Sequence, residues 1–517
     1  MALSTIIKSH CKTCGKVAVE VSRIDFGDSK LITLACGHFS SEEVIKGTDY
    51  ELLTNERGDK LMPFQINGVK FVENAGGRAL IADEQGLGKT VQALAILKLH
   101  NELNPTIVAT KATIKKQWLH QIKLWIPNLK VQILFSGKEI AVPGFDVYIT
   151  SYAMLAKEDV WKFIEPKTLI LDECQQITNH LSNRSKGAQK IGINCKHIIG
   201  LSGTPIRNHA GEYFTILNLL KPQLFPSYER FIRDYCDSYE SAYATKVGGL
   251  TNPELFREIT KDFIIRRTQE EVLPDLFALQ QPRRFHHVEL NKKLNPAYEI
   301  ASKELEKLIY QDEDSETMTH MLAIMNRMRQ ITGISKTVEC ADYIADHIIS
   351  TGRKIAVFAH HHAAVNLLEQ KINEWMKDGG YNPAVIVRAG DDSGAKLREL
   401  DNPNTKVIIC SGLASGEGMD GLQKLCSDMI ILERFWNPAS EEQIEKRLVR
   451  MGQTKPVNII YMIASETIDE YFTELVEQKR AIVTNTLDGK ELAWSESSLM
   501  RELAQVIVSK GKKAWRL

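Results

Sequence analysis

The feature that most limits how this chain can fold is a glycine-bearing loop between an apolar run and a helical pattern. Residues 79–82 are all apolar, which indicates a buried strand, and apolar residues recur at helical spacing after Thr90. Backbone N–H groups of such a loop can surround phosphate oxygens at the positive end of the helix. The sequence therefore predicts a phosphate site, with Lys89 on the terminal phosphates and the Thr90 hydroxyl on magnesium.

The match to the general phosphate-loop pattern is incomplete. That pattern, G-x-x-x-x-G-K-[ST], has glycine where this chain has Asp83. The rest of the loop contributes Gln85, Gly86 and Gly88 to the expected nucleotide contacts. Gln65 lies one strand ahead of the loop, and its amide can donate to and accept from the edge of adenine. A glutamine taken alone is more typical of a solvated helix, but this position favours the nucleotide.

Polar residues follow two further apolar runs at the points where strands are expected to end. Short β-branched runs alternate with helical patterns here, which predicts a parallel sheet with ligands at the carboxyl ends of its strands. The run 168–171 leads into Asp172 and Glu173. We expect Asp172 to hold magnesium through water, and Glu173 to orient and deprotonate the attacking water. The run 197–201 leads into residues 202–205, whose hydroxyls are expected to relay the state of the phosphate to a bound polymer.

A second parallel-sheet pattern occupies the later part of the chain. Its strands are predicted at residues 354–358, 384–387, 406–410, 429–432 and 457–463. The glycine-rich stretch 411–418 follows one of them, and Gly418 suits close approach of the backbone to phosphate or DNA. Between the two patterns, helices are predicted at 300–310 and 318–331, separated by an acidic insert, with their methionines facing a core.

The first segment carries two pairs of soft metal ligands. They are Cys11 and Cys14, then Cys36 and His38. Alternating apolar residues between the pairs predict a hairpin, and this layout is typical of a zinc ribbon with tetrahedral Zn²⁺. His10 is an alternative fourth ligand, and unpaired cysteines with a surface histidine are the alternative interpretation. A segment this small needs a metal or a cross-link to fold, which favours zinc.

Composition sets limits on partners and location. Among 517 residues, Lys+Arg and Asp+Glu balance at 65 each, so a nucleic-acid surface must be local. No apolar run approaches the roughly 18 residues of a membrane span, and the start has no export signal. Nine cysteines are an odd number, and most are scattered through apparent cores, which favours a reducing compartment. We expect an intracellular protein without membrane contact, cytoplasmic, or nuclear in a eukaryote.

In the order and spacing of these blocks, the sequence resembles the Swi/Snf-type translocases of helicase superfamily II over roughly residues 60–480. The matching stretches are residues 64–68, 83–90, 172–175, 201–205, 263–267 and 435–438, then Gln443, Arg447, Arg450, Gly452 and Gln453. Asp83 in place of glycine is common in this family. The resemblance implies two RecA-like lobes with ATP between them and DNA across their top. The stretch 419–422 departs from the family by one extra residue.

Three polar residues on a helix predicted from Ser440 gain a role from this resemblance. Gln443, Arg447 and Arg450 follow at spacings of four and three, so all three are expected to project from one face. Opposite a phosphate loop, such arginines complete the site when the lobes close. We expect Arg450 to be the main arginine finger and Arg447 its neighbour.

The predicted fold is α/β, with two RecA-like parallel-sheet lobes, helical insertions and a small zinc-ribbon-like β segment. The expected boundaries are 1–48 for the zinc-ribbon-like segment, 49–237 for the ATP-binding lobe, 238–336 for a helical bridging region, 337–485 for the second lobe and 486–517 for a C-terminal helix and basic tail. The predicted function is an ATP- and Mg²⁺-dependent motor on double-stranded or branched DNA. The chain is expected to be a monomer, with a possible protein partner at its zinc-ribbon-like segment. An RNA-directed helicase and a nucleotide-gated binding module are the alternatives.

Overall fold

The structure is a computed structural model that describes part of the chain. The described residues are 6–10, 17–25, 29–34, 39–43, 50, 53–205, 209–240, 245–309, 315–412, 419–435 and 438–487. The chain divides into two compact units, Met1–Met62 and Pro63–Leu517. Among the described helices, none carries an apolar stretch of the length that a bilayer crossing requires.

The first unit contains an antiparallel sheet with the strands in sequence order. Its described strands are β1 (Ile6–His10), β2 (Val17–Asp25), β3 (Ser29–Leu34) and β4 (Phe39–Glu43). The predicted hairpin is confirmed, since β2 pairs antiparallel with β3. The predicted zinc ligands Cys11, Cys14, Cys36 and His38 lie outside the described residues.

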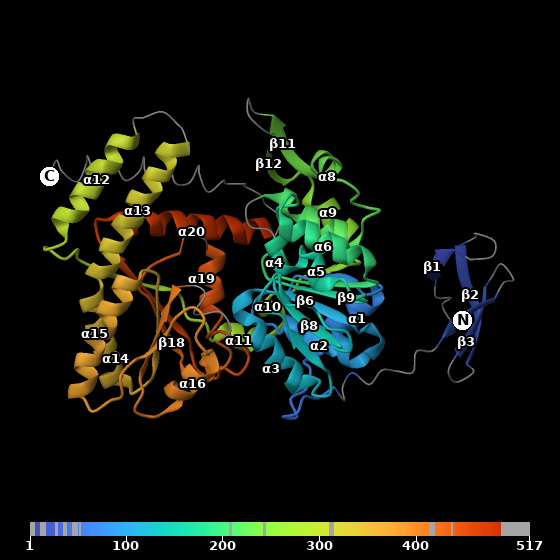
Figure 1. Ribbon diagram of the computed structural model, residues 1–517, viewed down its shortest axis with the longest axis horizontal. Helices are drawn as coiled ribbons and strands as arrows, with labels where there is room; N and C mark the ends of the chain where they lie inside the picture. Colours follow the sequence, from blue (N-terminus) through green and yellow to red (C-terminus); the bar gives the residue numbers. More distant parts are fainter. Residues whose placement is uncertain are drawn as a thin grey trace. The chain divides into compact units, whose positions relative to one another are not determined.

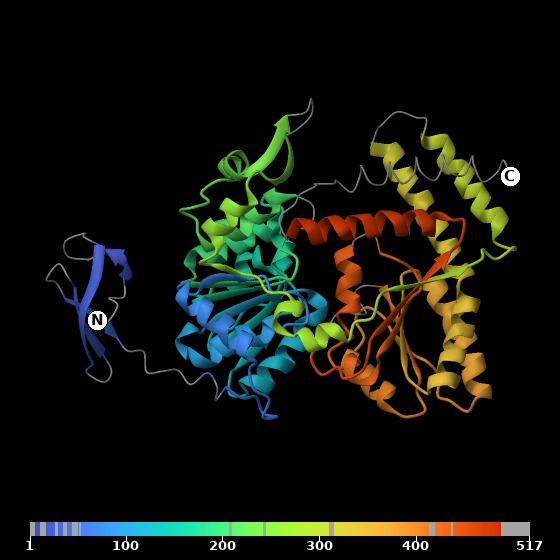
Figure 2. The same cartoon turned by 180° about the vertical axis from the view of Figure 1, so that it is seen from behind.

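The second unit begins with a parallel sheet, which we call lobe 1 (residues 63–265) together with its helices. In sheet order, the described strands are β13 (Ile264–Ile265), β5 (Arg78–Ile81), β10 (His197–Leu201), β9 (Thr168–Asp172), β6 (Thr106–Thr110), β8 (Val147–Ser151) and β7 (Val131–Ile133). Every pairing in this sheet is parallel, as the alternation of strand and helix patterns predicted. Figures 1 and 2 show helices on both faces of it.

The helices of lobe 1 connect these strands. They are α1 (Pro63–Asn74), α2 (Lys89–Leu99), α3 (Lys115–Trp125), α4 (Tyr152–Leu155), α5 (Glu158–Trp161), α6 (Asn183–Asn194), α7 (Phe214–Leu220), α8 (Tyr228–Tyr235) and α9 (Pro253–Thr260). A hairpin of β11 (Cys236–Glu240) and β12 (Thr245–Leu250) follows α8. Strands β5, β6, β9 and β10 are almost entirely buried, which explains the apolar residues at their centres.

A second parallel sheet forms the core of what we call lobe 2 (residues 284–487). In sheet order, the described strands are β14 (Arg284–Val288), β19 (Asn458–Ala464), β18 (Asp428–Ile431), β15 (Ile355–Ala359), β17 (Val407–Ser411) and β16 (Val385–Val387). Its helices are α12 (Asn295–Ile309), α13 (Ser315–Ser335), α14 (Thr337–Thr351), α15 (His362–Asp378), α16 (Ser393–Asp401), α18 (Leu422–Leu425), α19 (Pro438–Glu445) and α20 (Ile468–Leu487). The predicted strands of this lobe are confirmed to within a few residues.

Side-chain alternation along β15 divides the core of lobe 2 into two layers. Ile355, Val357 and Ala359 pack with α14 and α15, whereas Ala356 and Phe358 pack with α18 and α19. Figure 1 shows α14 and α15 on one side of this sheet and α19 on the other.

The segment expected to be a helical bridge also contributes strands. Between lobes 1 and 2 the chain forms α10 (Gln269–Val272) and α11 (Pro274–Ala278). Strand β13 pairs with β5 at the edge of lobe 1, and β14 pairs with β19 at the edge of lobe 2. The sequence did not predict either edge strand. The predicted helices α12 and α13 are present, and their methionines Met321, Met325 and Met328 are buried against α20 as expected.

Candidate functional site

The phosphate loop, residues 82–88, runs from β5 into α2 with two glycines in left-handed backbone. Gly86 has φ 88° and Gly88 has φ 73°, conformations that a side chain would strain. A Cβ on Gly88 would lie 2.4 Å from Gln65 Nε2, and one on Gly86 would lie 2.8 Å from Gln269 Nε2. The loop therefore needs glycine at both positions, and the resulting cradle fits phosphate oxygens.

Lys89, the first residue of α2, lies over the loop that precedes it. Its ammonium donates hydrogen bonds to the carbonyl oxygens of Asp83 at 2.8 Å and Glu84 at 3.2 Å. Burial lowers the pKa of Lys89, while the nearby carboxylates of Glu173, Asp83 and Asp172 act in the opposite direction. The cation is thus held at the mouth of the loop and close to the carboxylates that follow β9.

The departure from the general loop pattern at Asp83 has a structural reason. The Asp83 side chain is fully buried and accepts from Arg267, with Nε at 2.9 Å from Oδ1 and Nη2 at 2.5 Å from Oδ2. Gln92 of α2 donates to the same carboxylate at 3.0 Å, and the guanidinium also donates to the carbonyl of Phe64. Asp83 therefore ties the loop to α1, α2 and the residues after β13.

Gln65 is buried, whereas glutamine on a helix is ordinarily solvated. Its Nε2 donates to the Leu87 carbonyl at 3.1 Å, so the side chain is bonded to the phosphate loop. Gln85 and Thr90 are half-buried at the two ends of the same short segment. The structure thus places Gln65 beside Leu87 and Gly88 of the loop, and its predicted contact with adenine stays a prediction.

Asp172 ends β9 and is held in a fixed orientation. Its Oδ2 accepts from the Thr110 hydroxyl at 2.8 Å and from Trp118 Nε1 at 2.7 Å. Burial, followed by the charge of Glu173, raises the pKa of Asp172 to about 6. Within the described residues no cluster of three or more metal-ligating side chains occurs. The Asp172 carboxylate beside a phosphate cradle nevertheless fits a magnesium ion, which it would hold together with phosphate and water oxygens.

Glu173 adopts a backbone conformation that is rare for a residue with a side chain. Its φ of 55° lies in the left-handed region, which costs on the order of 1–3 kcal/mol and clusters at functional sites. Gln175 donates to the Glu173 carboxylate, and the Ser202 hydroxyl donates to Gln175 Oε1 at 2.6 Å. The Thr204 N–H in turn donates to Ser202 at 3.1 Å. A continuous hydrogen-bond chain therefore joins the ends of β9 and β10.

The predicted helix through Gln443, Arg447 and Arg450 was wrong in its length. Helix α19 ends at Glu445, so Gln443 lies on it, whereas both arginines lie in the turns that follow. At the helix end the backbone changes to tighter i→i−3 hydrogen bonds, from the Arg447 N–H to Ile444 and from the Leu448 N–H to Glu445. The three side chains consequently do not share one helical face.

Arg450 nevertheless lies beside the phosphate loop. A Cβ on Gly86 would lie 3.6 Å from the Val449 carbonyl oxygen and 3.9 Å from Arg450 Cγ. The guanidinium Nε of Arg450 is 3.5 Å from Asp420 Oδ1, and this cation lowers the pKa of Asp420. Arg447 is half-buried in the preceding turn, and Gly418 lies outside the described residues.

Sequence reasoning missed the residues that join the two lobes at this point. Gln269 Nε2 donates to the Gln85 carbonyl at 3.0 Å as well as to Val449, and its backbone N–H donates to Glu84. Lys446 Nζ lies 2.9 Å from Glu84 Oε1 and also contacts Gln269. A single uncharged glutamine carries no pattern that would distinguish it. Its only signal was its position directly after the stretch 263–267.

These features define a phosphate-loop α/β protein built on two parallel sheets. The family profile of the SNF2-related domain matches residues 64–335, more than half of the chain. The chain therefore belongs to the SNF2-related domain family.

Full-length relatives and a solved structure of this family are similar to the chain. The DNA annealing helicase and endonuclease ZRANB3 of Mus musculus is 26% identical over 86% of the chain and 42% of the relative. The SWI/SNF-related matrix-associated actin-dependent regulator of chromatin subfamily A-like protein 1 of Xenopus tropicalis is 29% identical over 84% and 46%. The chain thus spans less than half of these relatives. The SWI2/SNF2 ATPase core of Sulfolobus solfataricus in complex with dsDNA is 22% identical, with TM-score 0.38, over 87% of the chain and 96% of that structure.

Replacing Asp83 with glycine restores the general loop pattern but is expected to destabilise the protein. The change leaves the Arg267 guanidinium, 13% exposed, without its carboxylate, and breaking such a pair costs about 3–5 kcal/mol. We expect Asp83→Gly and Arg267→Ala each to lower the unfolding temperature. The double variant should lower it by less than the sum of the two single decreases. Thermal unfolding followed by circular dichroism measures this, with exposed Arg257→Ala on α9 as the control. Equal temperatures for Asp83→Gly and the control would contradict it.

Proposed function

We propose that this chain is an ATP-hydrolysing motor that moves on or remodels double-stranded or branched DNA. Membership of the SNF2-related family supports the class of activity. The observation that carries the proposal is the approach of the Arg450 segment in lobe 2 to the phosphate loop in lobe 1. A nucleotide site shared by two lobes can convert hydrolysis into relative movement, because closure completes the site and product release opens it.

Each residue of the site then has a defined task. Lys89 moves from the loop carbonyls onto the terminal phosphates, and Gln65 positions the loop and the base. Glu173 orients the attacking water and accepts its proton, while Asp172 holds a magnesium-bound water. Magnesium, when bound, neutralises charge on the phosphate oxygens. Arg450 stabilises the charge that develops on the transferred phosphoryl group.

The hydrogen-bond chain from Glu173 through Gln175 to Ser202 supports coupling between nucleotide and polymer. Loss or gain of charge beside Glu173 changes the acceptor strength of its carboxylate. Gln175 and Ser202 pass that change to the backbone at Thr204, at the carboxyl end of β10. This edge is where ligands of a parallel sheet gather.

The proposed domain arrangement follows the predicted boundaries, with the first unit as a zinc ribbon. The residues that flank the ligand pairs are His10 and Val17, and Leu34 and Phe39. Because adjacent strands are antiparallel, all four flanking residues lie at one end of the sheet, which supports a shared metal. A protein partner at this unit, the monomeric state and an intracellular location stay predictions.

The ATPase rate across a panel of nucleic acids tests the function. We expect duplex or branched DNA to stimulate hydrolysis more than single-stranded DNA or RNA. Lys89→Ala should reduce the rate to background, and Arg450→Ala should lower it on the order of 10³-fold, whereas exposed Arg398→Ala should not. Preferential stimulation by RNA would replace the DNA motor with an RNA-directed one. ATP binding without stimulated hydrolysis would leave a nucleotide-gated binding module.

Interrupting the hydrogen-bond chain is expected to uncouple stimulation from ATP binding. Ser202→Ala removes the hydroxyl that joins Gln175 to Thr204, and the lost bond is worth about 1–2 kcal/mol. The DNA-stimulated rate should fall about five- to thirtyfold, while the affinity for a fluorescent ATP analogue is retained. Ser350→Ala on α14 is the matched control. An unchanged ratio of stimulated to basal rate for Ser202→Ala would disprove the relay.

Metal analysis of the purified chain tests the zinc proposal. We expect one equivalent of zinc, lost in the Cys11→Ser/Cys14→Ser double variant and retained in Cys340→Ala, whose thiol is in the core of lobe 2. Stoichiometric zinc in the double variant, or none in the unaltered chain, would rule out these ligands.

A further inference from the structure

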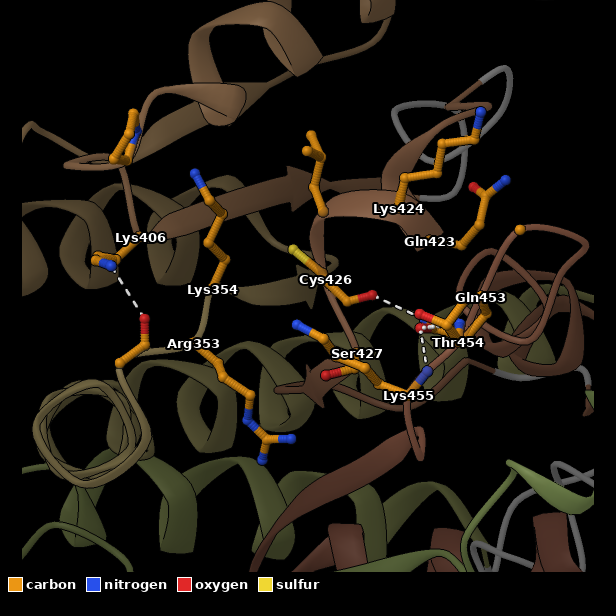
Figure 3. Close-up of a pocket in the computed structure, with 14 residues that line it drawn as sticks. Arg353, Lys354, Lys406, Gln423, Lys424, Cys426, Ser427, Gln453, Thr454 and Lys455 are labelled. Carbon is orange, nitrogen blue, oxygen red and sulfur yellow. Dashed lines mark hydrogen bonds between the residues drawn. The ribbon is translucent and has the colours of Figure 1, made fainter.

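A pocket opens at the edge of lobe 2 opposite to the carboxyl ends of its strands. It has a volume of about 270 Å³ and is lined by residues that precede β15, β17, β18 and β19. Lys89, Asp172, Glu173 and Arg450 are not among the residues that line it. Figure 3 shows the labelled side chains around it, with Arg353, Lys354 and Lys406 along one side and Lys424, Gln453 and Lys455 along the other.

The side chains that line this pocket include several cations and no carboxylate. Five lining residues are lysine or arginine, and none is aspartate or glutamate. The five are Arg353, Lys354, Lys406, Lys424 and Lys455. The whole chain has equal numbers of acidic and basic residues, so this excess of basic residues is local to the pocket. A concavity lined by charges of one sign focuses the field and attracts counter-ions, so the pocket favours an anion.

Three of the cations are fixed by the ends of the strands. Lys354 donates to the carbonyls of Asn402 at 2.6 Å and Thr405 at 3.1 Å, and Lys406 donates to Gly352 at 3.0 Å. The Arg353 guanidinium is 3.3 Å from Asp428 behind the pocket. These bonds leave the three charges in place on rigid backbone, which lowers the entropy lost when an anion binds.

The other two cations are available to a ligand. Lys424 and Lys455 are exposed, and neither ammonium makes a hydrogen bond or salt bridge within the described residues. They are contributed by two separate segments, the end of α18 and the loop before β19. Both can therefore turn toward an anion held over the fixed cations.

The wall of the pocket is continuous with the Arg450 segment. Gln453 Nε2 donates to Cys426 at 3.0 Å and to Leu448 at 3.3 Å, and its backbone N–H donates to the Arg450 carbonyl at 3.0 Å. Gln453 Oε1 accepts from the N–H groups of the next two residues. An anion in the pocket would thus be bonded to the same loop that presents Arg450 to the phosphate loop.

We propose that this pocket binds a backbone phosphate of nucleic acid, as a contact additional to the one made by the motor cleft; this rests on the proposed function. Lysine ammoniums are point charges that suit a phosphate in any orientation, whereas a carboxylate is recognised best by a free arginine fork. The one arginine here faces Asp428. The volume lies below the roughly 300–1,000 Å³ of small-molecule pockets, and so suits a phosphate with its sugar.

The salt dependence of DNA binding by the full chain tests this site. Binding of labelled duplex DNA without nucleotide is followed by fluorescence anisotropy over a range of salt concentrations. Lys424→Gln/Lys455→Gln should weaken binding roughly tenfold at low salt and make the slope of log affinity against log salt shallower by about 1 for each lysine. The control Lys303→Gln/Lys377→Gln removes two exposed lysines of the same lobe and should change neither.

Each other outcome overturns the proposal in a distinguishable way. If the pocket and control variants show equal slopes of log affinity against log salt, the pocket does not bind a DNA phosphate. The proposed motor function would be unaffected by that result. If the unaltered chain binds ATP but no DNA, both the pocket proposal and the proposed function are wrong. A further outcome is that inorganic phosphate raises the unfolding temperature of the unaltered chain and of the control variant but not of the pocket variant. If the salt slopes of DNA binding are then unchanged, the pocket is a site for free phosphate. Displacement by a polyglutamate peptide but not by DNA would indicate an acidic protein partner.

Discussion

The buried ion pair between Asp83 and Arg267 is the interaction on which the nucleotide site depends. A carboxylate with no exposure is tolerated only when it is paired and hydrogen-bonded, and Arg267 and Gln92 satisfy it. The pair joins the loop after β5 to a residue that follows β13, far along the chain. The same guanidinium reaches the Phe64 carbonyl on α1. One side chain thus sets the positions of α1, the loop and α2 before any ligand arrives.

The parts of the fold that sequence reasoning predicted are those whose signal is local. A buried parallel strand needs a short apolar run, and the run 168–171 shows it without reference to any other residue. The carboxylates that follow it could be assigned because a parallel sheet collects ligands at that edge. The structure places Lys89 over the loop and Glu173 in left-handed backbone, and their catalytic roles stay predictions.

The features that sequence reasoning missed depend on contacts between residues that are far apart in the sequence. Strand β13 has two residues and β14 is largely exposed, so neither shows a periodic pattern, and both exist because an edge of a sheet accepts them. The end of α19 was missed for a similar reason. No residue near Glu445 signals a helix end, and the chain changes there to i→i−3 bonds before the Val449 carbonyl accepts from the distant Gln269. The physical reason for Asp83 in the loop likewise depends on a distant residue, Arg267.

Strands β13 and β14 have a mechanical consequence, since the chain between them is anchored in both sheets. Residues 266–283 form a tether whose length caps the separation of the lobes. Two short helices, α10 and α11, take up part of that length. A helical residue advances about 1.5 Å, and an extended one about 3.3–3.6 Å. Melting either helix would therefore lengthen the tether, so that the two sheets could separate further while β13 and β14 stay paired.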